Sequence, residues 1–270
     1  MIALLLIALL SFQCGAPDGP VLPLHKGDHI ILIGNNLGSR MMNFGHFETE
    51  LHLRYPDSLL YLRNVCDGGD TPGFRPHSGR AKPWAFPGAE KFQTELAKNS
   101  GSEGHLETPD EWLTRHGADV IIAFFGYNES FEGEAGLENY KAELTAFIAH
   151  TLGQKYNGES APRLALVSPI AFENLSARYD LPDGKAENAR LTLYTAAMRQ
   201  VADSMGVLFL DVFAPTKQWF DSAKEALTID GFQLTDAGYA RFAPLLADGI
   251  FGKAPAKAAT HRAAIHAAVL

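Results

Sequence analysis

The sequence predicts an α/β fold in which helices cover both faces of a parallel sheet of about five strands, a three-layer α/β/α sandwich. Short apolar runs rich in β-branched residues alternate along the chain with longer amphipathic stretches. This alternation is typical of strands joined by right-handed crossover helices. The apolar runs contain few polar residues, as expected for strands that are buried on both faces.

The predicted elements follow one another without an internal repeat. The strands are expected at residues 29–33, 58–65, 118–125, 163–168 and 207–211. The helices are expected at residues 44–55, 89–98, 109–117, 137–152, 187–205, 215–224 and 237–250. The helix after Thr108 has the clearest start, because Thr108 can cap it and Pro109 suits its first turn. Residues 253–270 form an Ala-rich tail, which is either a helix or the start of a truncated region.

The composition indicates one globular domain, which we place at residues 26–252. The chain has 270 residues, of which 46% are hydrophobic and 20% are charged, enough for one large core. Its formal net charge is −8. Because no basic surface is available to neutralise phosphates, we expect no nucleic-acid partner.

The first ten residues are almost wholly apolar. This run is too short to span a membrane but suits a signal peptide, so we expect residues 1–16 to direct export to the periplasm or the extracellular space. The protein should not be an integral membrane protein. If Cys14 is removed with the signal peptide, Cys66 remains alone. The sequence therefore predicts no disulfide framework, no metal site and no cofactor.

The first strand leads into a candidate ligand site. The apolar run of residues 29–33 ends at Gly34, and two Asn residues and a helical stretch follow. In an open α/β sheet, the turn at the carboxyl end of the first strand lies in the ligand crevice, where backbone N–H groups converge. Asn36 is therefore expected to lie where chemistry would occur.

Four turns at strand ends belong together. They read G-N-N at 34–36, G-D-T at 69–71, G-Y-N-E at 126–129 and D-G-F-Q-L-T-D-A-G-Y at 230–239. In this order they resemble the four blocks of the SGNH, or GDSL, hydrolase superfamily, in which the blocks contain G-D-S, a Gly in a G-D-T-like turn, G-x-N-D, and D-x-x-H followed by L-T-x-x-G-Y. The resemblance covers residues 27–250 and implies a flavodoxin-like winding of the sheet.

The resemblance also implies roles for particular residues. Asn36 occupies the nucleophile's position, Gln233 the position of the base and Asp230 that of the acid. Gly69 and Asn128 match the donors of the oxyanion hole. A carboxamide neither ionises near neutral pH nor accepts a proton readily, so Asn36 and Gln233 cannot replace Ser and His. In its substituted first block, the sequence resembles the N-terminal SGNH-like domains of large exported proteins of planctomycete-like bacteria.

Simpler interpretations exist for each residue. The glycines can serve only to turn the chain, Asn128 can bind the neighbouring loop, and Asp230 can cap its own turn. Other groups could replace the missing ones: a displaced nucleophile, an activated water or a different base. Ser39 is the candidate for a displaced nucleophile. Asp70, Glu129 and Asp230 together could activate a water molecule. His46 or His77 could replace the base. Tyr127, Phe131 and Trp84 are expected to pack, unless they are exposed beside the crevice.

Three hypotheses follow. The first is an exported SGNH-like pseudoenzyme that binds a small-molecule or glycan ligand, acylated or carbohydrate-like, in the former esterase crevice. The second is an active esterase with a non-standard nucleophile or an activated water. The third is a non-catalytic structural module of a longer chain.

Overall fold

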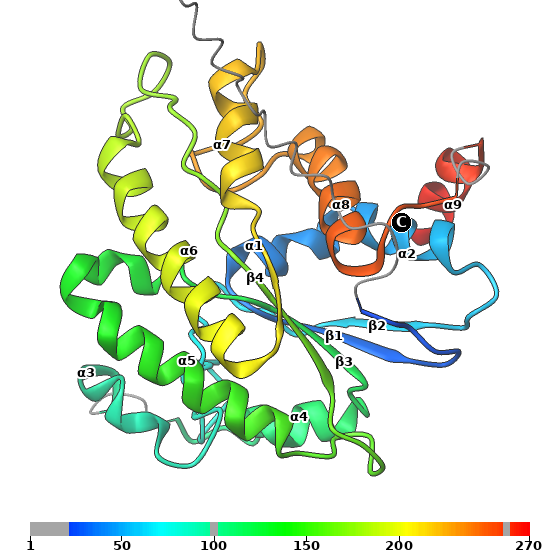
Figure 1. Ribbon diagram of the computed structural model, residues 1–270, viewed down its shortest axis with the longest axis vertical. Coiled ribbons are helices and arrows are strands. Elements are labelled where there is room, and N and C mark those ends of the chain that lie inside the picture. Colours follow the sequence, from blue (N-terminus) through cyan, green and yellow to red (C-terminus); the bar gives the residue numbers. More distant parts are fainter. Residues whose placement is uncertain (1–21, 98–101, 256–259) are drawn as a thin grey trace, which may run out of the picture.

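The computed structural model describes residues 22–97, 102–255 and 260–270 (Figure 1). At its centre lies a five-stranded parallel sheet in the order β2-β1-β3-β4-β5. The strands are β1 (His29–Gly34), β2 (Tyr61–Asn64), β3 (Val120–Phe124), β4 (Arg163–Val167) and β5 (Leu208–Leu210). The expected α/β sandwich with flavodoxin-like winding is therefore confirmed. The predicted signal peptide, including Cys14, lies outside the described residues.

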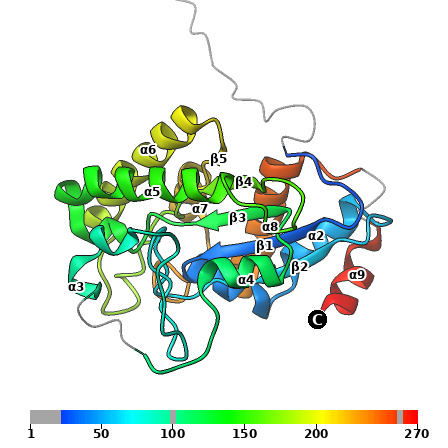
Figure 2. The same cartoon turned by 90° about the horizontal axis from the view of Figure 1, so that it is seen from below.

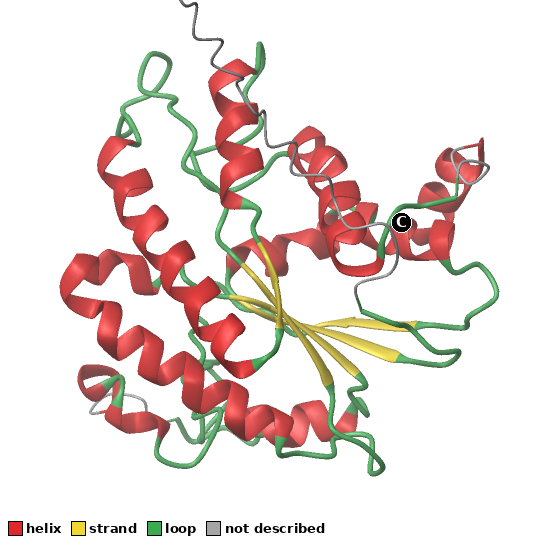
Figure 3. Cartoon of the chain, in the orientation of Figure 1, coloured by secondary structure: helices red, strands yellow, loops and turns green. Residues whose placement is uncertain are grey.

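Helices cover both faces of the sheet (Figure 3). They are α1 (Asn36–Ser39), α2 (His46–Arg54), α3 (Thr94–Ala97), α4 (Pro109–Arg115), α5 (Leu137–Leu152), α6 (Lys185–Met205), α7 (Phe213–Ser222), α8 (Asp236–Phe251) and α9 (Arg262–Val269), with 3₁₀ turns η1 (Arg40–Asn43), η2 (Ala89–Lys91) and η3 (Glu129–Gly136). One face of the sheet packs against residues of α1, α2 and α8, and the other against α4, α5 and α6.

Strand β1 shows why the sheet is stable. Ile30 and Leu32 face the α2 and α8 side, while Ile31 and Ile33 face the α5 side, and each is at most 1% exposed. Burying each of these side chains contributes roughly 1.5–3 kcal/mol. β-Branched side chains also favour the extended backbone, so the same residues both form the strand and fill two cores.

The winding places the carboxyl ends of β1 and β3 next to each other, because Gly34 pairs in register with Phe124. The sheet order reverses at this point, which is where open α/β sheets bind ligands. A Cβ atom on Gly34 would lie 2.1 Å from the carbonyl oxygen of Phe124, and the Gly34 φ of 112° disfavours any other residue. Glycine here allows the chain to turn at the carboxyl edge of the sheet.

Some helices differ from the expectation. Within the expected helix 44–55, only α2 is helical. Gly45, with a φ of 61°, separates α2 from the preceding α1 and η1. The expected helix 89–98 is divided into η2 and α3. By contrast, α4 starts with the predicted cap, in which Thr108 and Glu111 form a reciprocal capping box.

The C-terminal helix α9 packs against α2 (Figure 2). Arg262 forms an ion pair with the buried carboxylate of Glu50, and the His266 ring bonds the carbonyl oxygen of Phe44 at 2.7 Å. None of the described helices combines the length and the apolar character needed to cross a bilayer.

Candidate active site

The first block positions Asn36 at the start of a helix. The Asn35 N–H donates to the carbonyl oxygen of Phe124 at 2.9 Å, and its side-chain oxygen accepts from Leu37 N–H at 3.1 Å. Asn35 therefore caps α1, and Asn36 becomes the first helical residue after the strand. The side chain of Asn36 is half-buried. Its Oδ1 atom lies 3.2 Å from the point where a Cβ on Gly68 would stand, so the side chain lies against the second block.

The third block holds the second block in place. The side-chain amide of Asn128 donates to the carbonyl oxygens of Gly68, at 3.1 Å, and Asp70, at 2.9 Å. Both N–H groups of this amide are engaged, as the loop-binding interpretation expects. Gly69 lies between the two carbonyls that Asn128 binds and is exposed. An oxyanion could use the Asn128 amide only if one of these bonds were exchanged.

The last block places Gln233 beside Asp230. One carboxylate oxygen of Asp230 accepts from the N–H groups of Phe232 and Gln233, at 3.0 and 2.7 Å, and so closes the turn. The other oxygen accepts from the Gln233 side chain at 2.9 Å. Asp230 therefore caps its own turn and also orients the side chain of Gln233. A carboxylate would orient an imidazole in the same manner.

Aromatic packing brings the last block to the first and third blocks. The rings of Tyr127 and Phe232 are stacked with centroids 3.3 Å apart. The Tyr239 hydroxyl, at the end of the last block, donates to the carbonyl oxygen of Leu37 at 2.9 Å. The four turns predicted from the sequence therefore meet at the carboxyl edge of β1 and β3.

Of the groups considered as substitutes for the nucleophile and the base, the side chains of both histidines have other partners. Ser39 ends α1, and its N–H bonds the carbonyl oxygen of Asn35. His46 pairs with Asp236 at 2.7 Å and stacks on His266. His77 is exposed and accepts from the Gly79 N–H at 3.0 Å.

Two buried acids lie in the blocks, and sequence reasoning considered both only as candidates for activating water. Burial raises the pKa of Asp70 to about 8, although Arg75 opposes this shift. Both carboxylate oxygens of Asp70 are buried without a hydrogen-bond partner among the described residues. Burial likewise raises the pKa of Glu129 to about 8, and its carboxylate accepts from the Gly126 N–H at 2.8 Å. Both groups are therefore mainly neutral at pH 7.

Sequence reasoning missed Glu143. This residue of α5 is fully buried, and one of its oxygens accepts from Thr71 Oγ1 at 3.1 Å and from the Gly73 N–H at 3.0 Å. Glu143 therefore anchors the second-block turn to α5. An acidic residue inside an amphipathic helix gives no sequence signal for such a role. The described residues contain no cluster of His, Cys, Asp and Glu suited to a metal ion.

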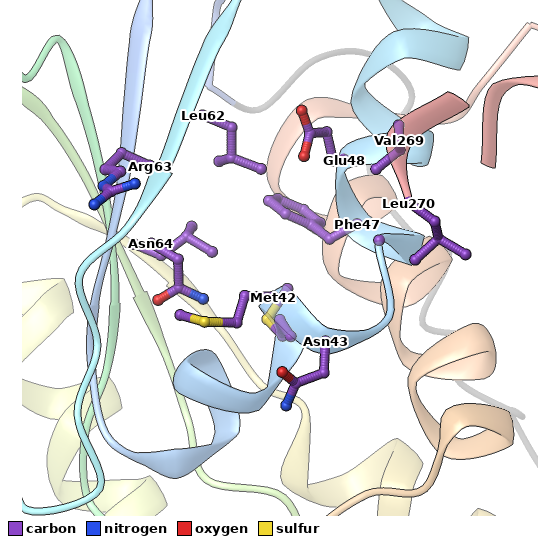
Figure 4. Close-up of a pocket in the computed structure, with 12 residues that line it drawn as sticks. Met42, Asn43, Phe47, Glu48, Leu62, Arg63, Asn64, Val269 and Leu270 are labelled. Carbon is purple, nitrogen blue, oxygen red and sulfur yellow. The ribbon is translucent and has the colours of Figure 1, made fainter. Parts of the chain in front are cut away.

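A separate groove of about 370 Å³ lies between the edge strand β2 and α2 (Figure 4). Met42, Phe47 and Leu62 line it together with the terminal residues Val269 and Leu270. None of the residues predicted for the site lines this groove, so it is distinct from the crevice.

No curated protein sequence matches the chain. Among solved structures, Axe2, an acetylxylan esterase from Geobacillus stearothermophilus, superposes with a TM-score of 0.55 at 14% identity and covers 84% of this chain and 95% of its own. LAE5, an α/β hydrolase from the metagenome of Lake Arreo in Spain, gives 0.57 at 16% identity, covering 84% and 96%. A gut microbial diltiazem-metabolizing enzyme gives 0.57 at 16% identity, covering 87% and 49%.

These similarities concern the fold. The family comparison goes further, because the family profile of the GDSL-like lipases and acylhydrolases matches residues 69–241. The matched segment contains the second, third and last blocks, including Gly69, Asn128, Asp230 and Gln233, and it begins after Asn36. The chain therefore belongs to the GDSL-like lipase/acylhydrolase family.

Proposed function

We propose that this protein binds an acylated or carbohydrate-like ligand in its crevice and does not hydrolyse esters by the serine mechanism. The observation that carries the proposal is the contact between Asp230 and Gln233. The carboxylate that would orient a base holds a carboxamide instead. With Asn36 at the expected place of the nucleophile, neither group can form or activate an attacking oxygen.

The loss of both groups would leave little catalysis. In the serine protease subtilisin, loss of the nucleophile or the base alone costs about 10⁶ in turnover. Binding does not depend on these groups, because a neutral donor such as the Asn128 amide can bind a carbonyl oxygen once it exchanges one of its two loop bonds. The acyl and sugar chemistry of the proposed ligand is supported by the family description and by Axe2, which is named an acetylxylan esterase. We also propose that the protein is exported, on the basis of its apolar first residues.

A ligand titration tests this function. The unfolding temperature should rise with acetylated xylo-oligosaccharides and rise less with the same oligosaccharides after alkaline removal of the acetyl groups. A ligand at 100 times its Kd stabilises the folded state by about 2.7 kcal/mol. A chromogenic acetyl ester should be turned over no faster by the wild type than by the Asn36→Ala variant.

Two results would contradict the proposal. Ester turnover that disappears in Asn36→Ala would favour the active-esterase hypothesis. Unfolding temperatures that no acyl or sugar compound changes would favour the structural-module hypothesis.

A further inference from the structure

An exposed aromatic ring stands next to the predicted site. Phe131 lies in η3, where its N–H bonds the carbonyl oxygen of Asn128 at 3.4 Å, and its side chain is 65% exposed. Tyr127 lies perpendicular to it, with ring centroids 5.4 Å apart, and Tyr127 also stacks on Phe232. The three rings form a row from the surface to the residue before Gln233. Because the Phe131 side chain is mostly exposed, it contributes little to the hydrophobic core.

Charged groups surround this row of rings. The guanidinium of Arg190 lies over one face of the Phe131 ring, 5.9 Å from its centroid, and Arg190 donates a hydrogen bond to the carboxylate of Glu187 at 3.3 Å. Burial and then the charges of Asp230 and Glu187 raise the pKa of Tyr127 to about 12, so these carboxylates lie near its ring. Arg190 therefore covers part of one face of the Phe131 ring, and the exposed remainder of the ring is a flat apolar surface beside hydrogen-bonding groups.

We propose that Phe131 is a stacking platform for a neutral pyranose ring of an oligosaccharide whose adjoining part enters the crevice. This inference rests on the proposed function and names the ligand class. A pyranose has a face of C–H groups and a rim of hydroxyl groups, which match the ring face and the charged border. A hydrocarbon chain would remove water from the charged groups near this platform without replacing their hydrogen bonds.

Two further observations fit this ligand. The net charge of −8 disfavours anionic saccharides, because the field of the protein repels them. Tyr127 and Arg190 fix the orientation of the Phe131 ring, so binding requires little further ordering of this side chain.

Calorimetric titrations of the full chain with xylohexaose and cellohexaose test the platform. We expect Phe131→Ala to weaken binding about threefold to tenfold, the range of one aromatic contact. Phe131→Leu should weaken binding similarly because it lacks a flat face, whereas Phe131→Trp should retain it. Leu59→Ala is the matched control, since Leu59 is 75% exposed but precedes β2, at the opposite end of the sheet from the crevice.

Acetylated oligosaccharides separate this inference from the proposed function. If the wild type prefers acetylated ligands and Phe131→Ala leaves every Kd unchanged, the platform is wrong and the crevice function stands. If unacetylated hexaoses bind through Phe131 without any preference for acetyl groups, the platform stands and the acyl site is wrong. The platform is also overturned if the wild type binds neither hexaose. N-acetyl-phenylalaninamide is an aromatic probe that is not a sugar; if it binds as tightly as the hexaoses and loses the same affinity in Phe131→Ala, the platform is not specific for a pyranose and the inference is overturned.

Discussion

Replacing Asp70 by Asn should stabilise the fold, and the gain should increase with pH. Asp70 is 1% exposed, and its folded-state pKa is about 8 against an ordinary value of 3.8. Because the folded state holds this proton more tightly, the contribution of Asp70 to stability is fully present below pH ~4 and is lost as the pH rises towards 8. Asn has the same shape and does not ionise, so it avoids this loss.

The two pKa values set the magnitude. They differ by about 4 units, and each unit corresponds to about 1.4 kcal/mol, which gives a ceiling of about 6 kcal/mol above pH 8. Between pH 4.5 and 7.5 the stability advantage of Asp70→Asn over the wild type should grow by up to about 4 kcal/mol. Above pH ~8.5 the difference should become constant, because the folded-state carboxyl is then ionised as well.

Urea denaturation at pH 4.5, 6, 7.5 and 9 measures this difference. Asp57→Asn is the control, because Asp57 is exposed in the turn before β2 and a surface change should stay within about 0.5 kcal/mol at every pH. A difference between Asp70→Asn and the wild type that does not change from pH 4.5 to 7.5 would refute the reasoning.

Three further results are expected. Gly34→Ala should lower stability by about 3 kcal/mol or more in thermal denaturation, because its Cβ would meet the Phe124 carbonyl. Gly27→Ala, which shares a positive φ but has open space, should cost only about 1 kcal/mol, and equal costs would contradict this account. Asn128→Ala should cost about 1–3 kcal/mol and speed hydrogen exchange in the second-block turn, since two carbonyl groups lose their donor; unchanged exchange would contradict this. Organophosphonates should label no residue of the wild type in mass spectrometry, because Asn36 offers no activated nucleophile, and stoichiometric labelling would contradict the proposed function.

The regular elements could be predicted because their signals are local. The expected helix 137–152 has the bounds of α5, and the apolar run ending at Gly34 is β1. The four turns could be grouped because their residue types and order resemble one family. Their convergence then follows from the sheet order, which brings β1 and β3 together.

The remaining features depend on contacts between distant residues. The docking of α9 relies on the pairing of Arg262 with Glu50, and such an ion pair has no signature in either segment. The support that Glu143 gives to the second-block turn is hidden for the same reason. The break before α2 at Gly45 could have been considered, but an isolated Gly in a helical pattern is often tolerated.

The central claim is that Asn36 and Gln233 stand in the positions of the nucleophile and the base. The double substitution Asn36→Ser with Gln233→His tests it, because it should place a hydroxyl near an imidazole that Asp230 already orients. Each single change lacks one of the two groups, so it should remain nearly inactive. Errors of an ångström in placement can cost about 10²-fold, so the repaired site should be slower than a typical esterase.

The most direct measurement is the rate of hydrolysis of a small activated acetyl ester by the double variant and both single variants, each shown to be folded by circular dichroism. We expect activity in the double variant that clearly exceeds the sum of the activities of the two single variants. A folded double variant that is no more active than either single variant would contradict the assignment of Asn36 and Gln233.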